Sequence, residues 1–266
     1  MNDKNLIFIS RFLGIIALFI FITIYIAGPL FEYKDQVTGE VEFDEENLSF
    51  QCFSFLILDD VKYRDTPPEM EPYIGDKMYV YFPEGIWAYL IGYRTLPIWR
   101  VSIEGPQYPK SSYPDGITVL FTLTDIRGKA AEMNIINHFI GMYPMDVGAY
   151  TLRQLFPFIY ILFVLMIIIY LFYNGPGWWL FGLVPSLMPW YFLVSFAYWL
   201  YWFGHNLQDY GAFTLKPFMP TVLGDSKIAQ FVTHSYPHVG FYLLVLVFIL
   251  LLFSILIKSK ALKEVS

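Results

Sequence analysis

The residues of this sequence that could do chemistry are its four histidines and a methionine near one of them. The histidines are His138, His205, His234 and His238. Met142 follows His138 by four residues, so the two would share a face if one helix continued through both. Imidazole and thioether groups are ligands for copper, and thioether sulfur selects Cu(I). These five residues predict a metal site; the alternative is that the histidines make ordinary hydrogen bonds and the methionine packs.

Haem is the second cofactor that these positions allow. His205 closes the third apolar segment and His238 opens the fourth, so both are expected near the same membrane face. Two such histidines could ligate a non-covalent haem, or complete a metal site with His138. Pro237 opposes a regular helix that would align His234 with His238. The sequence therefore leaves the cofactor unassigned; of the two candidates, copper is favoured over non-covalent haem.

Other kinds of chemistry lack the residues that they need. Cys52 is the only cysteine, so the chain has no internal disulfide and no CxxC or CxxCH motif. The sequence contains no HExxH, GxSxG or Walker A motif. No basic stripe is present that would bind nucleic acid. The apolar segments hold no ionisable residue except Arg11, which argues against an ion-coupled transporter. We therefore do not expect an enzyme.

The composition is that of a membrane protein. Of 266 residues, 56% are hydrophobic and 15% are charged, whereas soluble domains carry about 25% charged residues. No Asp, Glu, Lys or Arg occurs between Arg153 and Asp209. A charge-free stretch of this length is too long for an ordinary buried helix, and a lipid environment explains it. The lipid bilayer is thus the first expected partner.

Four apolar segments are long enough to cross a bilayer, at about residues 6–30, 155–173, 178–203 and 239–257. A turn of Asn, Gly, Pro and Gly separates the second from the third. Prolines 185 and 189 are expected to kink or shorten the third segment, because each removes a backbone donor. The fold class predicted is an α-helical bundle of four transmembrane spans.

The basic residues beside the spans predict the orientation. Lys4 and Arg11 lie at the first span, and Lys258, Lys260 and Lys263 follow the last. The positive-inside rule then places both termini in the cytoplasm. The chain is expected to be a multi-pass inner-membrane protein whose large domain lies on the periplasmic side.

This topology divides the chain into four parts. Residues 1–30 form an N-terminal anchor, and 31–154 an extracytoplasmic domain in which acidic residues outnumber basic ones by about two to one. Residues 155–257 hold three spans with an outer loop at 204–238. Residues 258–266 are a cytoplasmic basic tail.

The extracytoplasmic domain is expected to be mostly β. Residues 116–124 and 77–82 are rich in β-branched and aromatic residues, with proline and glycine between them. Residues 128–139 have the apolar spacing of a short helix instead. In the outer loop, Asp225 could cap a short helix over residues 227–231.

Four short motifs in the second half of the chain carry a resemblance to a known family. They are Asn137-His138-Phe139-Ile140-Gly141-Met142, Gly204-His205-Asn206-Leu207, Lys216-Pro217-Phe218-Met219-Pro220 and Ile228-Ala229-Gln230-Phe231. Together they resemble the NosB-like bacterial membrane accessory proteins of nitrous-oxide reductase gene clusters, over about residues 125–242. The resemblance implies a role in assembling a copper reductase, supplying it with copper or passing electrons towards it. It supplies no catalytic residues.

Two functions follow as expectations. The first is a membrane accessory protein of an extracytoplasmic copper or redox enzyme, whose partners would be other membrane or periplasmic redox proteins. The second is a structural membrane subunit that docks a larger complex without a cofactor of its own, for which the abundant aromatic residues are suited.

Overall fold

The computed structural model describes residues 3–26, 63–65, 77–79, 95–108, 111, 113–123, 126–209, 211–212, 215–228 and 230–263. Within these ranges, the side chains of 63–65, 77–79, 127, 131 and 146–155 are not described. Cys52, and the larger part of the domain predicted at 31–154 that precedes residue 95, lie outside the described residues.

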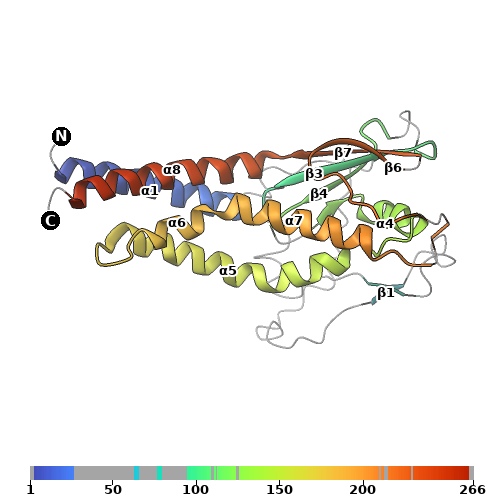
Figure 1. The fold of residues 1–266 in the computed structure, drawn as a ribbon, viewed down its shortest axis with the longest axis horizontal. Helices are drawn as coiled ribbons and strands as arrows, with labels where there is room; N and C mark the ends of the chain where they lie inside the picture. Colours follow the sequence, from blue (N-terminus) through green and yellow to red (C-terminus); the bar gives the residue numbers. More distant parts are fainter. Residues whose placement is uncertain are drawn as a thin grey trace.

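Five helices form an elongated bundle. Helix α1 (Asp3–Ile26) and helix α8 (Val239–Lys263) run side by side, and α5 (Asp146–Phe172), α6 (Leu180–Ser186) and α7 (Met188–His205) lie along them (Figure 1). Both termini lie at one end of the molecule, called here the terminal end. A β-sheet lies at the other, called the sheet end.

Two of these helices, α1 and α8, are long and apolar enough to cross a membrane. A third crossing results if α6 and α7 count as one span, because the pair is bent by 41° at Leu187. This bend confirms the kink predicted at the two prolines. The apolar stretch described in α5, Phe156–Phe172, is shorter. The length and composition of these helices are those of a membrane protein, and the count of four spans stays a prediction.

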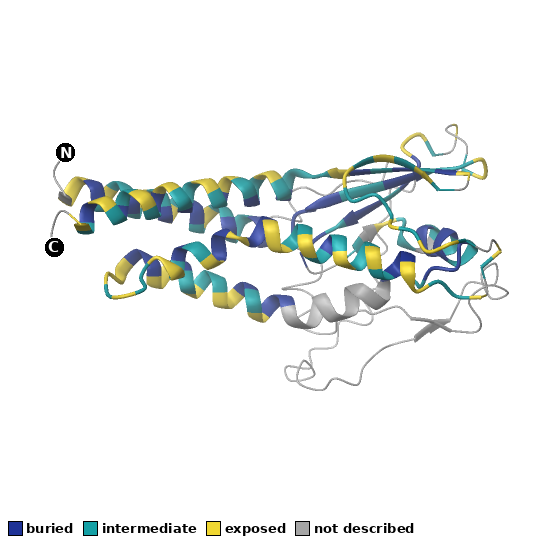
Figure 2. Ribbon diagram, in the orientation of Figure 1, coloured by how far each residue is buried: buried dark blue, intermediate teal, exposed yellow. Residues whose placement is uncertain are grey.

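Large apolar side chains cover the outside of the bundle. Phe8 and Phe19 of α1 are 69% and 71% exposed, and Val194 of α7 is 71% exposed. Exposed residues recur along each helix (Figure 2). Water would penalise such a surface, whereas lipid chains accept it.

The sheet has five antiparallel strands in the order β5-β4-β3-β7-β6. Its strands are β3 (Trp99–Glu104), β4 (Ile117–Phe121), β5 (Ile126–Gly128), β6 (Gly224–Ile228) and β7 (Phe231–Pro237). The central strand β3 pairs with β4 on one side and with β7 on the other. The sheet thus joins two stretches of chain that are far apart in the sequence.

This topology corrects two predicted boundaries. The outer loop at 204–238 is not simply a loop, since its second half supplies β6 and β7 to the sheet. Helix α5 begins at Asp146 rather than at 155, so the predicted domain end at 154 falls inside a helix. The domain is therefore not confined to residues 31–154.

The local predictions had mixed outcomes. Strand β4 and helix α4 (Ala130–Phe139) confirm the strand and the helix expected at 116–124 and 128–139. Strand β2 (Lys77–Tyr79) confirms part of the strand expected at 77–82, and pairs with β1 (Tyr63–Asp65). The helix expected at 227–231 is wrong, because Ser226 and Lys227 pair across to β7 instead.

The sheet has one apolar and one polar face, as alternation along a strand requires. Val101 and Ile103 of β3 point to the side covered by α4 and α7. At the start of β3, Trp99 is 2% exposed and packs against Phe192 and Phe196 of α7. The apolar face thereby holds the sheet onto the helices.

The C-terminal end of α8 is also corrected. The basic tail predicted from 258 onwards continues the helix as far as Lys263. Lys258 is only 1% exposed, and its Nζ donates to the carbonyl oxygens of Tyr170 (2.6 Å) and Tyr173 (2.9 Å). The last carbonyls of a helix have no partner within it, and a lysine can supply one. Lys258 therefore caps α5.

Candidate functional site

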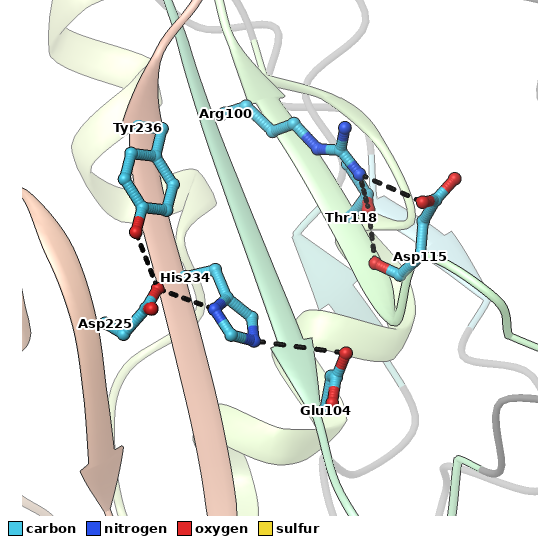
Figure 3. Close-up of polar contacts among 7 residues, drawn as sticks. All are labelled: Arg100, Glu104, Asp115, Thr118, Asp225, His234 and Tyr236. Carbon is cyan, nitrogen blue, oxygen red and sulfur yellow. Dashed lines mark hydrogen bonds and ion pairs between the residues drawn. The ribbon is translucent and has the colours of Figure 1, made fainter.

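The polar face of the sheet carries a cluster of charged and hydroxyl groups from three strands. The cluster, called here the polar cluster, consists of Arg100 and Glu104 of β3, Asp225 of β6, and His234 and Tyr236 of β7 (Figure 3). Arg100 and Glu104 are four positions apart on β3, and His234 and Tyr236 are two apart on β7, so each pair points to one side of the sheet. Register places Arg100 opposite Tyr236, and Asp225 opposite His234.

His234 lies at the centre of the polar cluster, between two carboxylates. Its Nδ1 is 2.6 Å from Oδ1 of Asp225, and its Nε2 is 3.9 Å from Oε1 of Glu104. An ionised carboxylate can only accept, so Nδ1 carries the proton that His234 donates to Asp225. In neutral imidazole, Nε2 is then the lone-pair nitrogen, and it points towards Glu104 (Figure 3).

Asp225 accepts two hydrogen bonds at one oxygen, since the Tyr236 hydroxyl donates to Oδ1 at 2.9 Å. The bond from His234 lowers the pKa of Asp225 most, and the bond from Tyr236 adds to the effect. The hydrogen bond from Tyr236 to Asp225 also raises the pKa of Tyr236, because it holds the phenol in its protonated form. Both groups are exposed, so the electrostatic effect is small and screened by salt.

We expect acid to destabilise the wild type more than Asp225→Asn. A group with a depressed pKa stabilises the fold above its unfolded pKa, and this stability is lost as the pH falls through the folded pKa. For Asp225 this window lies at and below its ordinary pKa of 3.8. Melting temperatures between about pH 5 and about pH 3 measure the effect. An equal acid-induced decrease in both proteins would show that the hydrogen bonds to Asp225 are absent.

Arg100 of the polar cluster also contacts Asp115 and Thr118, and its charge acts on His238, which follows β7. The Arg100 guanidinium lies 3.7 Å from Oδ1 of Asp115 and donates weakly to Thr118 Oγ1 at 3.4 Å. Burial, and then the charge of Arg100, lower the pKa of His238. Among the described residues, Nδ1 of His238 is buried without a hydrogen-bond partner.

The helix with His138 ends before it reaches Met142. Helix α4 ends at Phe139, and Gly141 has a positive φ of 75° that turns the chain. The Met142 backbone N–H donates to the carbonyl of Asn137 at 2.7 Å within this turn. The shared helical face that would align His138 with Met142 is therefore not formed. Burial lowers the pKa of His138.

His205 lies at the exposed end of α7. Its ring stacks on Tyr201 at a centroid distance of 3.8 Å, and its Nδ1 is 2.8 Å from the Tyr201 carbonyl oxygen. Both contacts are made within one helical turn. These contacts hold the imidazole against its own helix, as expected for a histidine in the last turn of a helix.

Met142 lies on the other side of the sheet from His234. It lines a cavity of about 140 Å³ between the apolar face of the sheet, α4 and α7, as do Met133, Met145 and Met188. Val101 and Ile103, which alternate with the polar residues of β3, line the same cavity. The sheet therefore separates this thioether from the imidazole of His234.

The histidines thus share one end of the molecule without sharing one site. His138, His205, His234 and His238 all belong to the sheet end (Figure 1). In the part of the chain that the structure describes, no group of three or more His, Cys, Asp or Glu residues could hold a metal ion. A metal site from these histidines and Met142 stays a prediction.

The carboxylates beside His234 were not identified from the sequence. Their only sequence signal is the alternation of polar residues on β3 and on β7, which indicates two half-exposed strands but not that the strands are neighbours. The residues of the polar cluster come from three separate strands, so no short sequence motif contains them. Neither a family model, a curated protein nor a solved structure matches this chain.

Proposed function

We propose that the chain is an integral membrane accessory protein that docks to an extracytoplasmic copper or redox enzyme and supports its assembly or its supply of copper or electrons. The proposal includes four spans, cytoplasmic termini and a sheet end in the periplasm. It takes the enzyme class, a nitrous-oxide reductase system, from the resemblance to NosB-like proteins. The single observation that carries it is the polar cluster.

The polar cluster has the properties of a docking surface. Two carboxylates, on Glu104 and Asp225, flank the imidazole of His234, and Arg100 of β3 is the one arginine of the cluster. The side chains of Glu104, Asp225 and His234 are between 30% and 56% exposed. Such carboxylates attract basic side chains on a partner and fix its orientation.

The tautomer of His234 favours a role in copper supply. Histidines that bind metals commonly donate their other ring N–H to a carboxylate, which fixes the ring. Asp225 has this relation to His234, and Nε2 then faces Glu104. Imidazole and carboxylate make two ligands, too few to retain copper firmly. A third ligand from the partner would complete the site during transfer.

The test is complementation in the native host. In a strain that lacks this gene, we expect wild type to restore the activity and copper content of the reductase, and a Glu104→Gln, His234→Ala double variant to fail. Glu132→Gln, which changes a carboxylate on α4 outside the polar cluster, should behave as wild type. Equal amounts of each variant in the membrane fraction exclude a folding defect. Full restoration by the double variant would contradict the proposal.

A structural subunit without a cofactor is the second candidate, favoured by the dispersed histidines. Copper titration of the purified protein separates the two functions. Loss of bound copper in His234→Ala, with no loss in His205→Ala, supports copper supply. Identical copper binding in both variants and wild type supports the structural role.

A further inference from the structure

The cavity behind the sheet lies between the two apolar cores of the protein. At one end, Phe156 of α5 and Met188 of α7 belong to the core formed by the helices. At the other end, Ile103 of β3 and Phe203 of α7 belong to the core beneath the sheet. Its volume is about 140 Å³, and an engineered apolar cavity of about 150 Å³ binds benzene. The cavity is therefore large enough for a six-membered ring.

Helix α7 forms one long wall of the cavity. Its lining side chains recur at helical spacing from Met188 to Phe203, so they form one stripe along the helix. At about 1.5 Å per residue the stripe is about 22 Å long. It includes the aromatic side chains of Phe192, Phe196 and Trp199. Aromatic walls favour contact with another flat ring, and the length of the stripe leaves room for a chain attached to that ring.

Two buried polar side chains also line the cavity. Asn137 of α4 and Thr233 of β7 are each 6% exposed. Within the part of the chain that the structure describes, neither the Asn137 amide nor the Thr233 hydroxyl makes a hydrogen bond. The side-chain nitrogen and oxygen atoms that are both unbonded and enclosed by described residues belong to Arg11 and His238 instead. The amide and the hydroxyl are therefore accessible from the cavity, where each can donate to a ligand.

The lining of the cavity selects a neutral ligand. Among the described residues that line it, none is Asp, Glu, Lys, Arg or His. A carboxylate or phosphate group would lose its hydration there without meeting an opposite charge, which is costly. A carbonyl oxygen is neutral and accepts hydrogen bonds, so it suits the two donors.

The cavity opens on the side of α7 that carries exposed apolar residues. Tyr191 lines the cavity and is itself 50% exposed. Val194, one turn further along α7, is 71% exposed and belongs to the apolar outer surface of the bundle. Lipid chains accept such a surface. A ligand dissolved in the bilayer can therefore reach the cavity without passing through water.

We propose that this cavity binds a lipid-soluble quinone, a neutral ring with carbonyl groups and an apolar tail. The ring packs against the aromatic side chains of α7, and Asn137 and Thr233 donate hydrogen bonds to its carbonyl oxygens. The tail follows the α7 stripe towards Met188. An apolar pocket with a few polar groups that fix orientation is the usual form of a small-molecule site. The site lies on the opposite face of the sheet from the polar cluster and does not depend on docking there.

The experiment titrates the full chain in nanodiscs with decylubiquinone. Native mass spectrometry counts the quinone retained per chain, and the melting temperature is measured at each concentration. We expect wild type to retain the quinone and to melt at a higher temperature with it. Asn137→Leu and Thr233→Val, which remove the two donors, should each bind it about five- to tenfold more weakly. Asn206→Leu, which replaces an exposed amide outside the cavity, should bind as wild type.

Two further arms separate a quinone site from a general apolar cavity and from a structural role of the asparagine. Decylbenzene has a ring and a tail but no carbonyl, and it should bind more weakly than the quinone and equally to wild type and Asn137→Leu. Without quinone, Asn137→Leu should melt no lower than wild type, because leucine replaces an unbonded amide. A lower melting temperature would show that the amide is bonded within the protein and would overturn its role. Equal binding of the quinone by wild type, Asn137→Leu and Thr233→Val, or no binding by wild type, would overturn the site.

Discussion

Replacing Trp99 with alanine should lower the free energy of unfolding by about 3–5 kcal/mol, the usual cost of truncating a buried tryptophan. Trp99 is 2% exposed and contacts Phe192 and Phe196 of α7 and Phe241 of α8. Alanine would leave a cavity where the sheet meets both helices. Chemical denaturation of the detergent-solubilised protein measures the loss. Far-ultraviolet circular dichroism is the probe, because it reports on the backbone and not on tryptophan fluorescence.

The matched control is Trp99→Phe. Phenylalanine keeps an aromatic ring but loses the hydrogen bond that Nε1 donates to Ser235 Oγ at 2.8 Å. The loss of this bond should cost about 1 kcal/mol, apart from a smaller packing term. Ser235 keeps its bond to the Val222 carbonyl at 2.8 Å, so its hydroxyl stays satisfied. Equal effects of alanine and phenylalanine would show that the ring does not fill this interface.

The second large effect is expected for Gly204→Ala, which should cost about 3 kcal/mol, the upper end of the range for overpacking. A Cβ atom on Gly204 would overlap the carbonyl oxygen of Phe218 and lie 3.1 Å from Cδ of Pro220. The Phe218 N–H also donates to the Gly204 carbonyl at 3.1 Å. The chain must therefore move away from α7. Thermal unfolding and limited proteolysis of residues 206–223 measure the change.

Gly224→Ala separates steric overlap from backbone strain. Gly224 has a positive φ of 98°, yet a Cβ atom there meets nothing within 4 Å. Its replacement should cost about 1 kcal/mol through strain alone. A larger loss for Gly224→Ala than for Gly204→Ala would mean that the segment at Phe218 does not lie against α7.

Features set by local sequence were predictable. The apolar runs of α1 and α8 appear directly in the sequence, as do the strand texture of β4 and the bend at Pro185 and Pro189. Each depends on residues within one or two turns of each other. The helix boundaries were less accurate, because the polar start of α5 and the basic end of α8 continue helices whose apolar parts are shorter.

Features set by non-local pairing were not predictable. Asp225 precedes Ser226 as a helix cap would, and only pairing with β7 shows that it belongs to a strand. The register between β3 and β7 brings Glu104 and His234 together. The residues of neither strand indicate that the two strands pair. The candidate copper ligands follow from residue type alone, whereas the turn at Gly141 and the sheet keep Met142 apart from His234.

The two halves of the sheet come from stretches of chain that are synthesised at different times. Strand β3 is synthesised long before its partner β7, because helices α4 to α7 come between them. Until β7 emerges, one edge of the nascent β3 has no partner from the sheet, and such an edge can pair with foreign strands. Completion of the sheet must therefore wait until the intervening helices have been synthesised. The β6–β7 hairpin can pair with β3 only after the chain between them has brought the two together. Such pairing between distant segments is typically slow.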